Sequence, residues 1–164
     1  MPLSHNNSLA VALGNLTIVF SKLEFIISNI IWRMVNREQA VGQIITAEMS
    51  FRNLIRAFES LSQYSLMQRQ NPPETQRFAI AQQLAKRAYS LEQQRNTYIH
   101  SLWTTGFPQE NIIHRVKFTA KRQLDFQITP TTLTEMDALV TDVDKLTGDF
   151  MMFMSDVITI MSPP

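Results

Sequence analysis

Apolar residues recur at spacings of three and four along most of the chain, a pattern typical of α-helices that bury one face. The first such stretch covers about residues 8–36, and its stripe consists of Leu9, Leu13, Leu16, Phe20, Leu23, Ile27, Ile30 and Met34. On another face of this stretch, Ile18, Phe25 and Trp32 recur every seven residues. A helix that is apolar on two faces is either central to its bundle or part of an oligomer interface.

Two further helices are expected before residue 105. One spans roughly 38–67, and the proline pair at 72–73 separates it from the next, because proline lacks a backbone donor and disfavours the helix that precedes it. The next begins at residue 73 or 74, with proline in its first turn, and a segment containing glycine and proline ends it at 104–108.

Between residues 112 and 129 the spacing changes to that of strands. Two extended pieces, 113–119 and 123–128, predict a short β-hairpin. Pro130 and the threonines after it can end the hairpin and cap a last helix, whose apolar stripe is interrupted only by Thr147. The sequence therefore predicts an all-α fold, an up-and-down bundle of four to five helices with a small β-hairpin insertion near 112–129.

The chain has 164 residues, of which 45% are hydrophobic and 18% charged, and its net charge is +1. These values predict a single domain over residues 1–164, and they exclude a disordered chain and a strongly basic nucleic-acid binder. The absence of cysteine excludes disulfides, thiolate metal sites and a cysteine nucleophile. We expect no metal and no cofactor. Met151, Met152 and Met154 are predicted to fill the core, because no histidine or cysteine accompanies them as a ligand.

The apolar run at 16–35 has the length of a membrane span. Lys22, Glu24 and Arg33 interrupt it, and each charge near the centre of a bilayer costs about 2.5–3.5 kcal/mol. The start of the chain lacks the positively charged region of a signal peptide. We predict a buried helix, a cytoplasmic protein and no membrane partner. A membrane-associated helical protein stays open as an alternative that rests on this run alone.

Basic side chains gather in the predicted hairpin, where no acid occurs between residues 111 and 124. We call this group the basic ribbon; it consists of His114, Arg115, Lys117, Lys121 and Arg122. Its lysines and arginines are candidate RNA contacts, because clustered positive charge attracts a phosphate backbone. Two plainer interpretations stay open, a solvated turn and pairing of the ribbon with the acidic last helix.

Arg95, Asn96 and His100 belong to the motif RNTYIH near the end of the third predicted helix. Arginine presents a planar set of donors that fits a phosphate, and histidine exchanges protons near neutral pH. The combination favours ribonuclease-type chemistry, with these three as candidate catalytic residues. The alternatives are a chance neighbourhood at a helix C-terminus, where cations are favoured anyway, and a buried structural histidine.

Helix geometry limits how this motif can act. Positions five apart differ by about 140° around the axis and by roughly 7.5 Å along it, so Arg95 and His100 do not share a face. Asn96 and His100 do share one, and the Asn96 amide can orient the imidazole. Arg95 can converge on His100 if the helix loosens by Ile99, or if a second copy completes the site across a symmetric interface.

The chain resembles the HEPN superfamily of small all-α domains, found in prokaryotic toxin, defence and RNA-processing systems. The resemblance rests on the first helix with FSKLEF at 20–25, on the helix–break–helix core, and on RNTYIH at 95–100 followed by SLW. It implies an up-and-down bundle, a homodimer, and a metal-independent endoribonuclease site formed by paired motifs. RNA and a cognate antitoxin protein are the further partners that such a member would have.

By this resemblance, Arg95 neutralises charge on the scissile phosphate, Asn96 positions the site, and His100 acts as general base or acid. The ribose 2′-hydroxyl attacks the adjacent phosphate, and stabilisation of the charged transition state supplies most of the rate. Glu24 and Tyr98 are candidate supporting residues.

Some features keep a competing prediction open. Leu102 stands where one HEPN subgroup has a modifiable tyrosine, two residues after the histidine, so regulation through that tyrosine is not expected. Glu24 is equally suited to a salt bridge with Arg95 or Arg87. Because many HEPN members lack activity, the competing prediction is a catalytically inactive helical dimer that binds a protein or a nucleotide.

Overall fold

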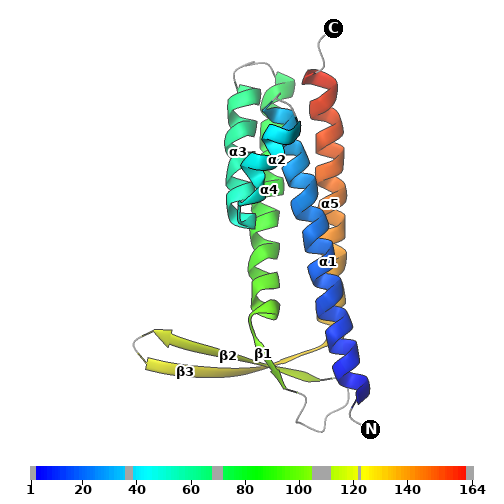
Figure 1. Cartoon of the computed structure of the whole chain (residues 1–164), viewed down its shortest axis with the longest axis vertical. Coiled ribbons are helices and arrows are strands. Elements are labelled where there is room, and N and C mark those ends of the chain that lie inside the picture. The colour runs from blue at the N-terminus through cyan, green and yellow to red at the C-terminus, as the bar shows by residue number, and fades with distance from the viewer. Residues whose placement is uncertain (1–2, 36–38, 68–71, 105–111, 122, 162–164) are drawn as a thin grey trace.

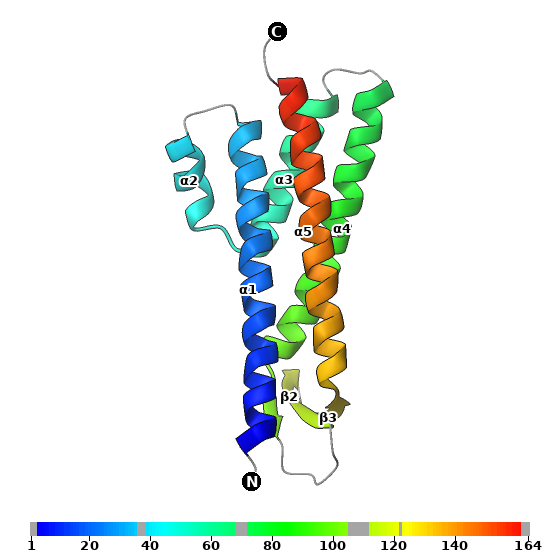
Figure 2. The ribbon, with the colours of Figure 1, turned by 90° about the vertical axis from the view of Figure 1, so that its right-hand side faces the viewer.

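The computed structural model describes residues 3–35, 39–67, 72–104, 112–121 and 123–161, and these ranges form five helices and three strands. The helices are α1 (Leu3–Met34), α2 (Gln39–Ala47), α3 (Phe51–Met67), α4 (Pro72–Ile99) and α5 (Leu133–Met161). The strands are β1 (Leu102–Thr104), β2 (Ile113–Lys121) and β3 (Gln123–Thr131). Four long helices lie alongside one another, α2 lies outside them, and the sheet lies at one end (Figure 1, Figure 2). The predicted helical bundle with a small β insertion is confirmed.

The core of the bundle confirms the stripe predicted for the first helix. Along α1 its members are buried from Leu9 to Met34, except for the partly buried Leu13. At the centre, the ring of Phe58 on α3 makes edge-to-face contacts with Phe150 and Phe153 on α5, at centroid distances of 5.2 and 5.5 Å. Edge-to-face pairs of this kind stabilise a core beyond the burial of their area.

The single helix expected over 38–67 is wrong, because the chain breaks between α2 and α3. Ser50 starts α3: its hydroxyl accepts a hydrogen bond from the amide of Asn53 (3.4 Å), and its carbonyl accepts one from the amide of Leu54 (2.9 Å). Serine competes well for this capping position because its side chain satisfies an otherwise unpaired amide. The apolar residues of α2 do not continue the buried face of α3, since Ile44 and Ile45 are exposed.

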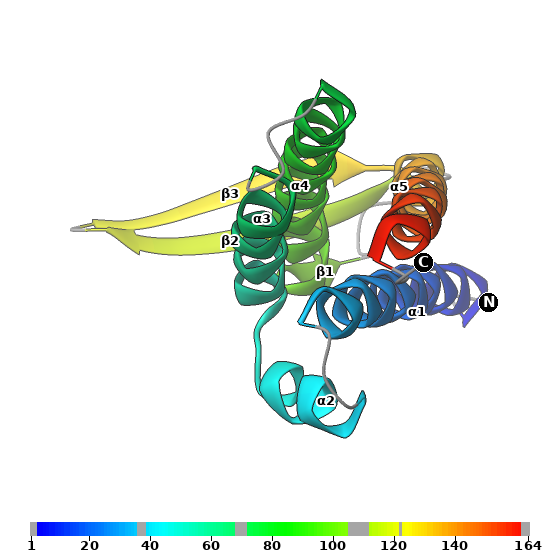
Figure 3. The ribbon, with the colours of Figure 1, turned by 90° about the horizontal axis from the view of Figure 1, so that it is seen from above.

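The sheet is antiparallel in the order β1-β2-β3. The predicted hairpin is confirmed in place, but it continues to Thr131, and the sequence did not predict β1, which occupies 102–104 where a helix was expected to end. Ile113 of β2 packs with Leu9 and Met136 and so anchors the sheet to α1 and α5. Figure 3 shows β2 and β3 extending away from the bundle on the side of α3 and α4.

Local signals set the starts of two helices. α4 begins at Pro72, one residue before the earlier of the two expected starts, and the missing amide of a proline costs nothing there. Before α5, Thr132 and Glu135 form a capping box: the Glu135 amide donates to Thr132 Oγ1 (3.2 Å), and the Thr132 amide donates to Glu135 Oε2 (3.1 Å). Thr147, the polar residue in the stripe of α5, is buried, and its hydroxyl donates to the carbonyl of Val143 (2.8 Å).

Charges and methionines on α5 correct two expectations. Asp144 pairs with Lys22 of α1 (3.3 Å) and Asp149 with Arg87 of α4 (2.6 Å), so these two acids bind neighbouring helices and not the basic ribbon. Met151 and Met152 are exposed and do not fill the core, because the helix turns them away from the buried stripe. Among the described residues, one helical stretch, Asn7–Met34, is long and apolar enough to cross a membrane, by length and composition alone.

Candidate functional site

His100 lies one residue beyond α4 and faces open space. Its backbone amide donates to the carbonyl of Asn96 (3.1 Å), which closes the last helical turn. Its exposed side chain lines a cavity of about 410 Å³ between α4 and β2. The other lining residues are Gln93, Asn96, Thr97, Ser101 and Lys117. The interpretation of His100 as a buried structural residue is therefore wrong.

Arg95 turns the other way, toward α1. It is half-buried, and its guanidinium carbon lies 5.8 Å from the centre of the Phe20 ring, a cation–π contact. Its Nη1 donates to Asn96 Oδ1 (3.0 Å), whereas its Nε is buried without an acceptor among the described residues. The guanidinium is held in place and still keeps donors that no described residue uses.

Asn96 connects the two sides of the motif. Its Oδ1 accepts from Arg95, and the residue also lines the cavity that contains His100. α4 stays helical through Ile99, so the first of the two alternatives for bringing Arg95 to His100, loosening of the helix by Ile99, is wrong. Within one chain Arg95 and His100 therefore lie on different faces of α4, as helix geometry requires.

Glu24 is half-buried on α1, near Arg95. Burial raises the pKa of its carboxyl group, and the positive charge of Arg95 lowers that pKa in part. Of the two partners suggested by the sequence, Arg95 is the one whose charge acts on Glu24, since Arg87 pairs with Asp149. Glu24 and Phe20, both on α1, thus interact with Arg95 through charge and through the ring contact.

Tyr98 packs at the junction of α4 and the sheet. Its ring stacks on Trp103 with an interplanar angle of 8°, and Trp103 Nε1 donates to the Tyr98 carbonyl (3.1 Å). Burial raises the pKa of the Tyr98 hydroxyl, the charge of Glu135 raises it further, and the charge of Arg115 lowers it. Tyr98 does not line the His100 cavity, so its role there is packing behind the motif.

The predicted RNA contacts divide between two places. Lys117 is exposed and lines the cavity with His100, so one cation of the basic ribbon joins the motif. Arg115 is half-buried and acts on Tyr98 instead. The side chain of Lys121 and the whole of Arg122 lie outside the described residues.

Three residues of the cavity were not predicted from the sequence. Gln93 and Thr97 lie seven and three positions before His100, and so on its side of the helix. The hydroxyl of Thr97 donates to the Gln93 carbonyl (2.9 Å), and the hydroxyl of Ser101 donates to the Thr97 carbonyl (2.6 Å). Helical spacing from His100 could have identified Gln93 and Thr97, whereas Ser101 follows the end of the helix.

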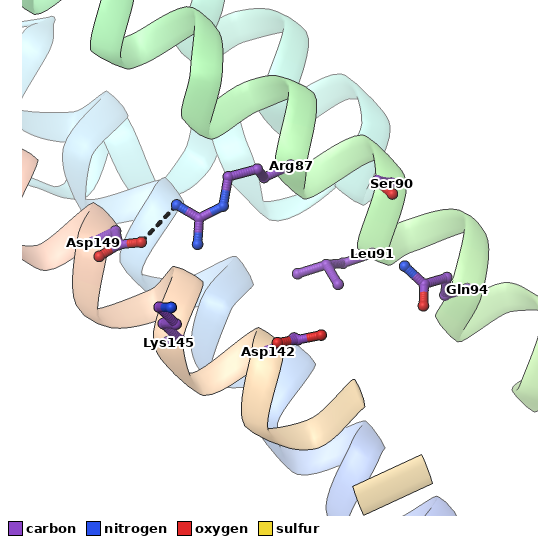
Figure 4. Close-up of a pocket in the computed structure, with 7 residues that line it drawn as sticks. All are labelled: Arg87, Ser90, Leu91, Gln94, Asp142, Lys145 and Asp149. Carbon is purple, nitrogen blue, oxygen red and sulfur yellow. Dashed lines mark hydrogen bonds and ion pairs between the residues drawn. The ribbon is translucent and has the colours of Figure 1, made fainter. Parts of the chain in front are cut away.

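A second cavity, of about 470 Å³, lies between α4 and α5 (Figure 4). Its lining consists of Arg87, Ser90, Leu91, Gln94, Asp142, Lys145 and Asp149. Arg87 reaches toward Asp149, and the pair spans the two helices (Figure 4). Two acids balance two bases there, so this cavity has no surplus of positive charge for a phosphate, and we assign it to helix contact.

Within the described part of the chain, no three histidine, aspartate or glutamate side chains gather to hold a metal ion. Comparison of the chain with protein-family models, with curated proteins and with solved structures found no match. The geometry around His100 therefore carries the functional argument.

Proposed function

We propose that this protein is a metal-independent endoribonuclease of the HEPN type. The observation that carries the proposal is the shared cavity lined by His100, Asn96 and Lys117, with Arg95 hydrogen-bonded to Asn96. A proton-exchanging imidazole beside an ammonium group and an amide suits attack on a phosphodiester. The mixed charges of the cavity between α4 and α5 offer no comparable arrangement.

The proposed reaction uses the RNA's own 2′-hydroxyl as nucleophile. His100 removes the proton of that hydroxyl while its oxygen attacks the adjacent phosphorus and the bond from phosphorus to the 5′-oxygen breaks. The products are a 2′,3′-cyclic phosphate and a 5′-hydroxyl. Lys117 offsets the negative charge that grows on the phosphoryl oxygens, and Asn96 orients the imidazole. Arg95, on the other face of α4, would offset that charge only from a second motif brought to the same phosphate.

The proposed active form is a homodimer. In one chain the guanidinium of Arg95 and the imidazole of His100 lie on different faces of α4, so one motif does not supply both groups to one phosphate. A two-fold axis beside α4 would bring two motifs together, and the partner subunit's His100 would protonate the leaving 5′-oxygen. The same proposal has the protein act on RNA in the cytoplasm, with a cognate antitoxin protein as its inhibitor.

RNA cleavage by the purified protein tests the proposal. Wild type should cut a labelled single-stranded RNA in EDTA and leave 2′,3′-cyclic phosphate ends, and a 2′-deoxy residue at the cut should block cleavage. His100→Ala should lower the rate by about 10²–10⁴-fold, the range for loss of general acid–base catalysis. Lys117→Ala should slow cleavage, whereas Lys145→Ala, which removes the lysine of the other cavity, should not. Equal cleavage by His100→Ala, or none by wild type at any salt concentration, would reject the activity.

A second candidate is a catalytically inactive helical dimer that binds a protein or a nucleotide. Ile18 and Phe25 favour it, because both remain more than half exposed on α1. This candidate predicts a dimer whose stability is the same in wild type and in His100→Ala, and which cuts no RNA. Sedimentation equilibrium of both proteins beside the cleavage assay separates the two candidates.

A further inference from the structure

One side of the β-sheet faces the helical bundle. Residues two apart on a strand, and residues opposite each other on paired strands, point to the same side. Ile113 of β2 packs with Leu9 and Met136 of the bundle. Arg115 follows two positions later and lies opposite Trp103 of β1, whose indole N–H donates to a carbonyl of α4. The side that carries Ile113, Arg115 and Trp103 is therefore the side toward the bundle.

Burial falls along β2 on this side. Ile113 is 2% exposed, Arg115 is half-buried and Lys117 is exposed. Lys117 lies about 13 Å beyond Ile113, because a strand rises about 3.3 Å per residue. β2 and β3 leave the bundle in this direction, on the side of α3 and α4 (Figure 3). Of the three positions, Lys117 is therefore the one at which this side of the sheet opens to solvent.

A row of polar residues crosses the sheet at Lys117, and we call Ser101, Lys117 and Gln127 the polar row. The antiparallel register places Gln127 of β3 directly opposite Lys117, and Gln127 is exposed. Ser101, one residue before β1, flanks Lys117 on the side away from β3, because β2 is the middle strand. Ser101 and Lys117 both line the His100 cavity, whereas Gln127 does not. Gln127 is thus the next position outward from the cavity, about 4.8 Å further across the sheet.

The charges of the sheet favour an anionic ligand at this row. β2 contains no acid, and the register places the single acid of β3, Asp125, opposite Thr119, two positions further out along β2 than Lys117. Lys117 supplies a positive charge for a phosphate, and Gln127 supplies a carbonyl acceptor and two amide donors. The edge of a nucleic-acid base carries donors and acceptors beside one another, which a glutamine amide matches. The polar row therefore has the chemistry of a nucleotide contact.

We propose that single-stranded RNA leaves the His100 cavity across the polar row, with a backbone phosphate at Lys117 and the edge of the neighbouring base at Gln127. The inference rests on the proposed function and adds to it a position that distinguishes one base from another. The base must be unpaired, because side chains do not reach base edges in the deep major groove of duplex RNA. The adjacent row of Arg115 and Trp103 packs toward the bundle, so the RNA continues outward past Gln127 and not along β1.

Binding of RNA that cannot be cleaved tests this path. Short 2′-O-methyl oligomers of adenosine, of cytidine and of uridine lack the nucleophile, and fluorescence anisotropy gives their dissociation constants at several salt concentrations in EDTA. Gln127→Ala should raise these constants unequally, by about 5-fold or more for the best-bound oligomer, and leave the salt dependence unchanged because the residue has no charge. Lys117→Ala should weaken binding of all three and lower the slope of log affinity against log salt by about 0.7, the value for one phosphate contact on a single strand.

Two variants serve as controls. Gln127→Lys should tighten binding and steepen the salt slope by about 0.7, because a lysine there reaches the phosphate chain that passes it. Gln82→Ala removes an exposed glutamine of α4 about 27 Å along the helix from His100, and it should bind all three oligomers as wild type does. Because the altered residues are exposed, the circular dichroism spectra of these variants should match that of wild type.

Other outcomes overturn the inference in distinguishable ways. If Gln127→Ala binds every oligomer as wild type does while wild type still cuts RNA, the path is lost and the proposed activity stays. Duplex RNA bound as tightly as the single strands would mean that no base edge is read. Competition by a polyglutamate peptide as strong as by RNA would mean that an acidic protein occupies the row. Base-dependent binding that Gln127→Ala loses, in a protein that cuts no RNA, keeps the path and rejects the proposed activity.

Discussion

Replacing Gly42 by alanine tests how tightly α2 is held against α1. The added Cβ would lie 2.6, 2.7 and 2.8 Å from Cδ1, Cγ and Cβ of Trp32. Carbon atoms in contact are normally about 3.5–4.0 Å apart, so the overlap is about 1 Å. Rotation of the indole ring does not remove it, because the Cβ of Trp32 moves only with the backbone of α1.

The expected loss of stability is the sum of three contributions. A retreat of about 1 Å would weaken the hydrogen bond from Trp32 Nε1 to Thr46 Oγ1, now 2.7 Å long, at a cost of about 1 kcal/mol. Overpacking costs about 1–3 kcal/mol more. The better helix propensity of alanine returns about 0.5–1 kcal/mol. We expect Gly42→Ala to lower the free energy of unfolding by about 1–3 kcal/mol in sum.

Urea unfolding followed by circular dichroism measures this change, and tryptophan fluorescence should shift to the red as α2 moves off Trp32. Gly148→Ala is the matched control: Gly148 lies inside α5, and a Cβ added there would meet nothing within 4 Å. The control should gain about 0.5–1 kcal/mol. A Gly42→Ala protein as stable as the control, with unchanged fluorescence, would refute the close packing of α2 on α1.

Three further predictions concern charges and caps. Burial raises the pKa of Glu24 above its value of 4.5 in the unfolded chain, so stability falls as the pH rises from 4.5 through the raised pKa. Between pH 4 and 7 the urea midpoint of Glu24→Gln should therefore change less than that of wild type. The difference corresponds to at most about 1 kcal/mol because the group is half-exposed. Thr132→Ala removes the capping box of α5 and should cost about 1 kcal/mol in thermal unfolding, whereas the exposed Thr134→Ala should change little. Arg87→Met breaks the ion pair with Asp149 and should lower the free energy of unfolding by at most about 1 kcal/mol in low salt and by less in 1 M salt. An equal loss of stability in 1 M salt would mean that Arg87 stabilises the protein by packing and not by its charge.

Sequence reasoning succeeded where the deciding interactions are local. The stripe from Leu9 to Met34 follows the helical period, and the capping threonine at 132 acts within its own turn, so spacing and residue type predict them. It failed to predict one helix break and one strand. The cap at Ser50 divides one expected helix into two, and the strand at 102–104 forms because β2 offers it a partner.

For the candidate site, the sequence by itself determined which groups are candidates for chemistry and that Arg95 and His100 point apart on one helix. Only the tertiary structure decided their surroundings: Lys117 joins His100 because the sheet folds back beside α4, and Arg95 meets Phe20 because α1 packs there. The same holds for α1, whose two apolar lines look alike in sequence. One is buried by α3, α4 and α5, and the other stays open from Val11 to Phe25, because burial depends on which neighbours arrive from distant parts of the chain.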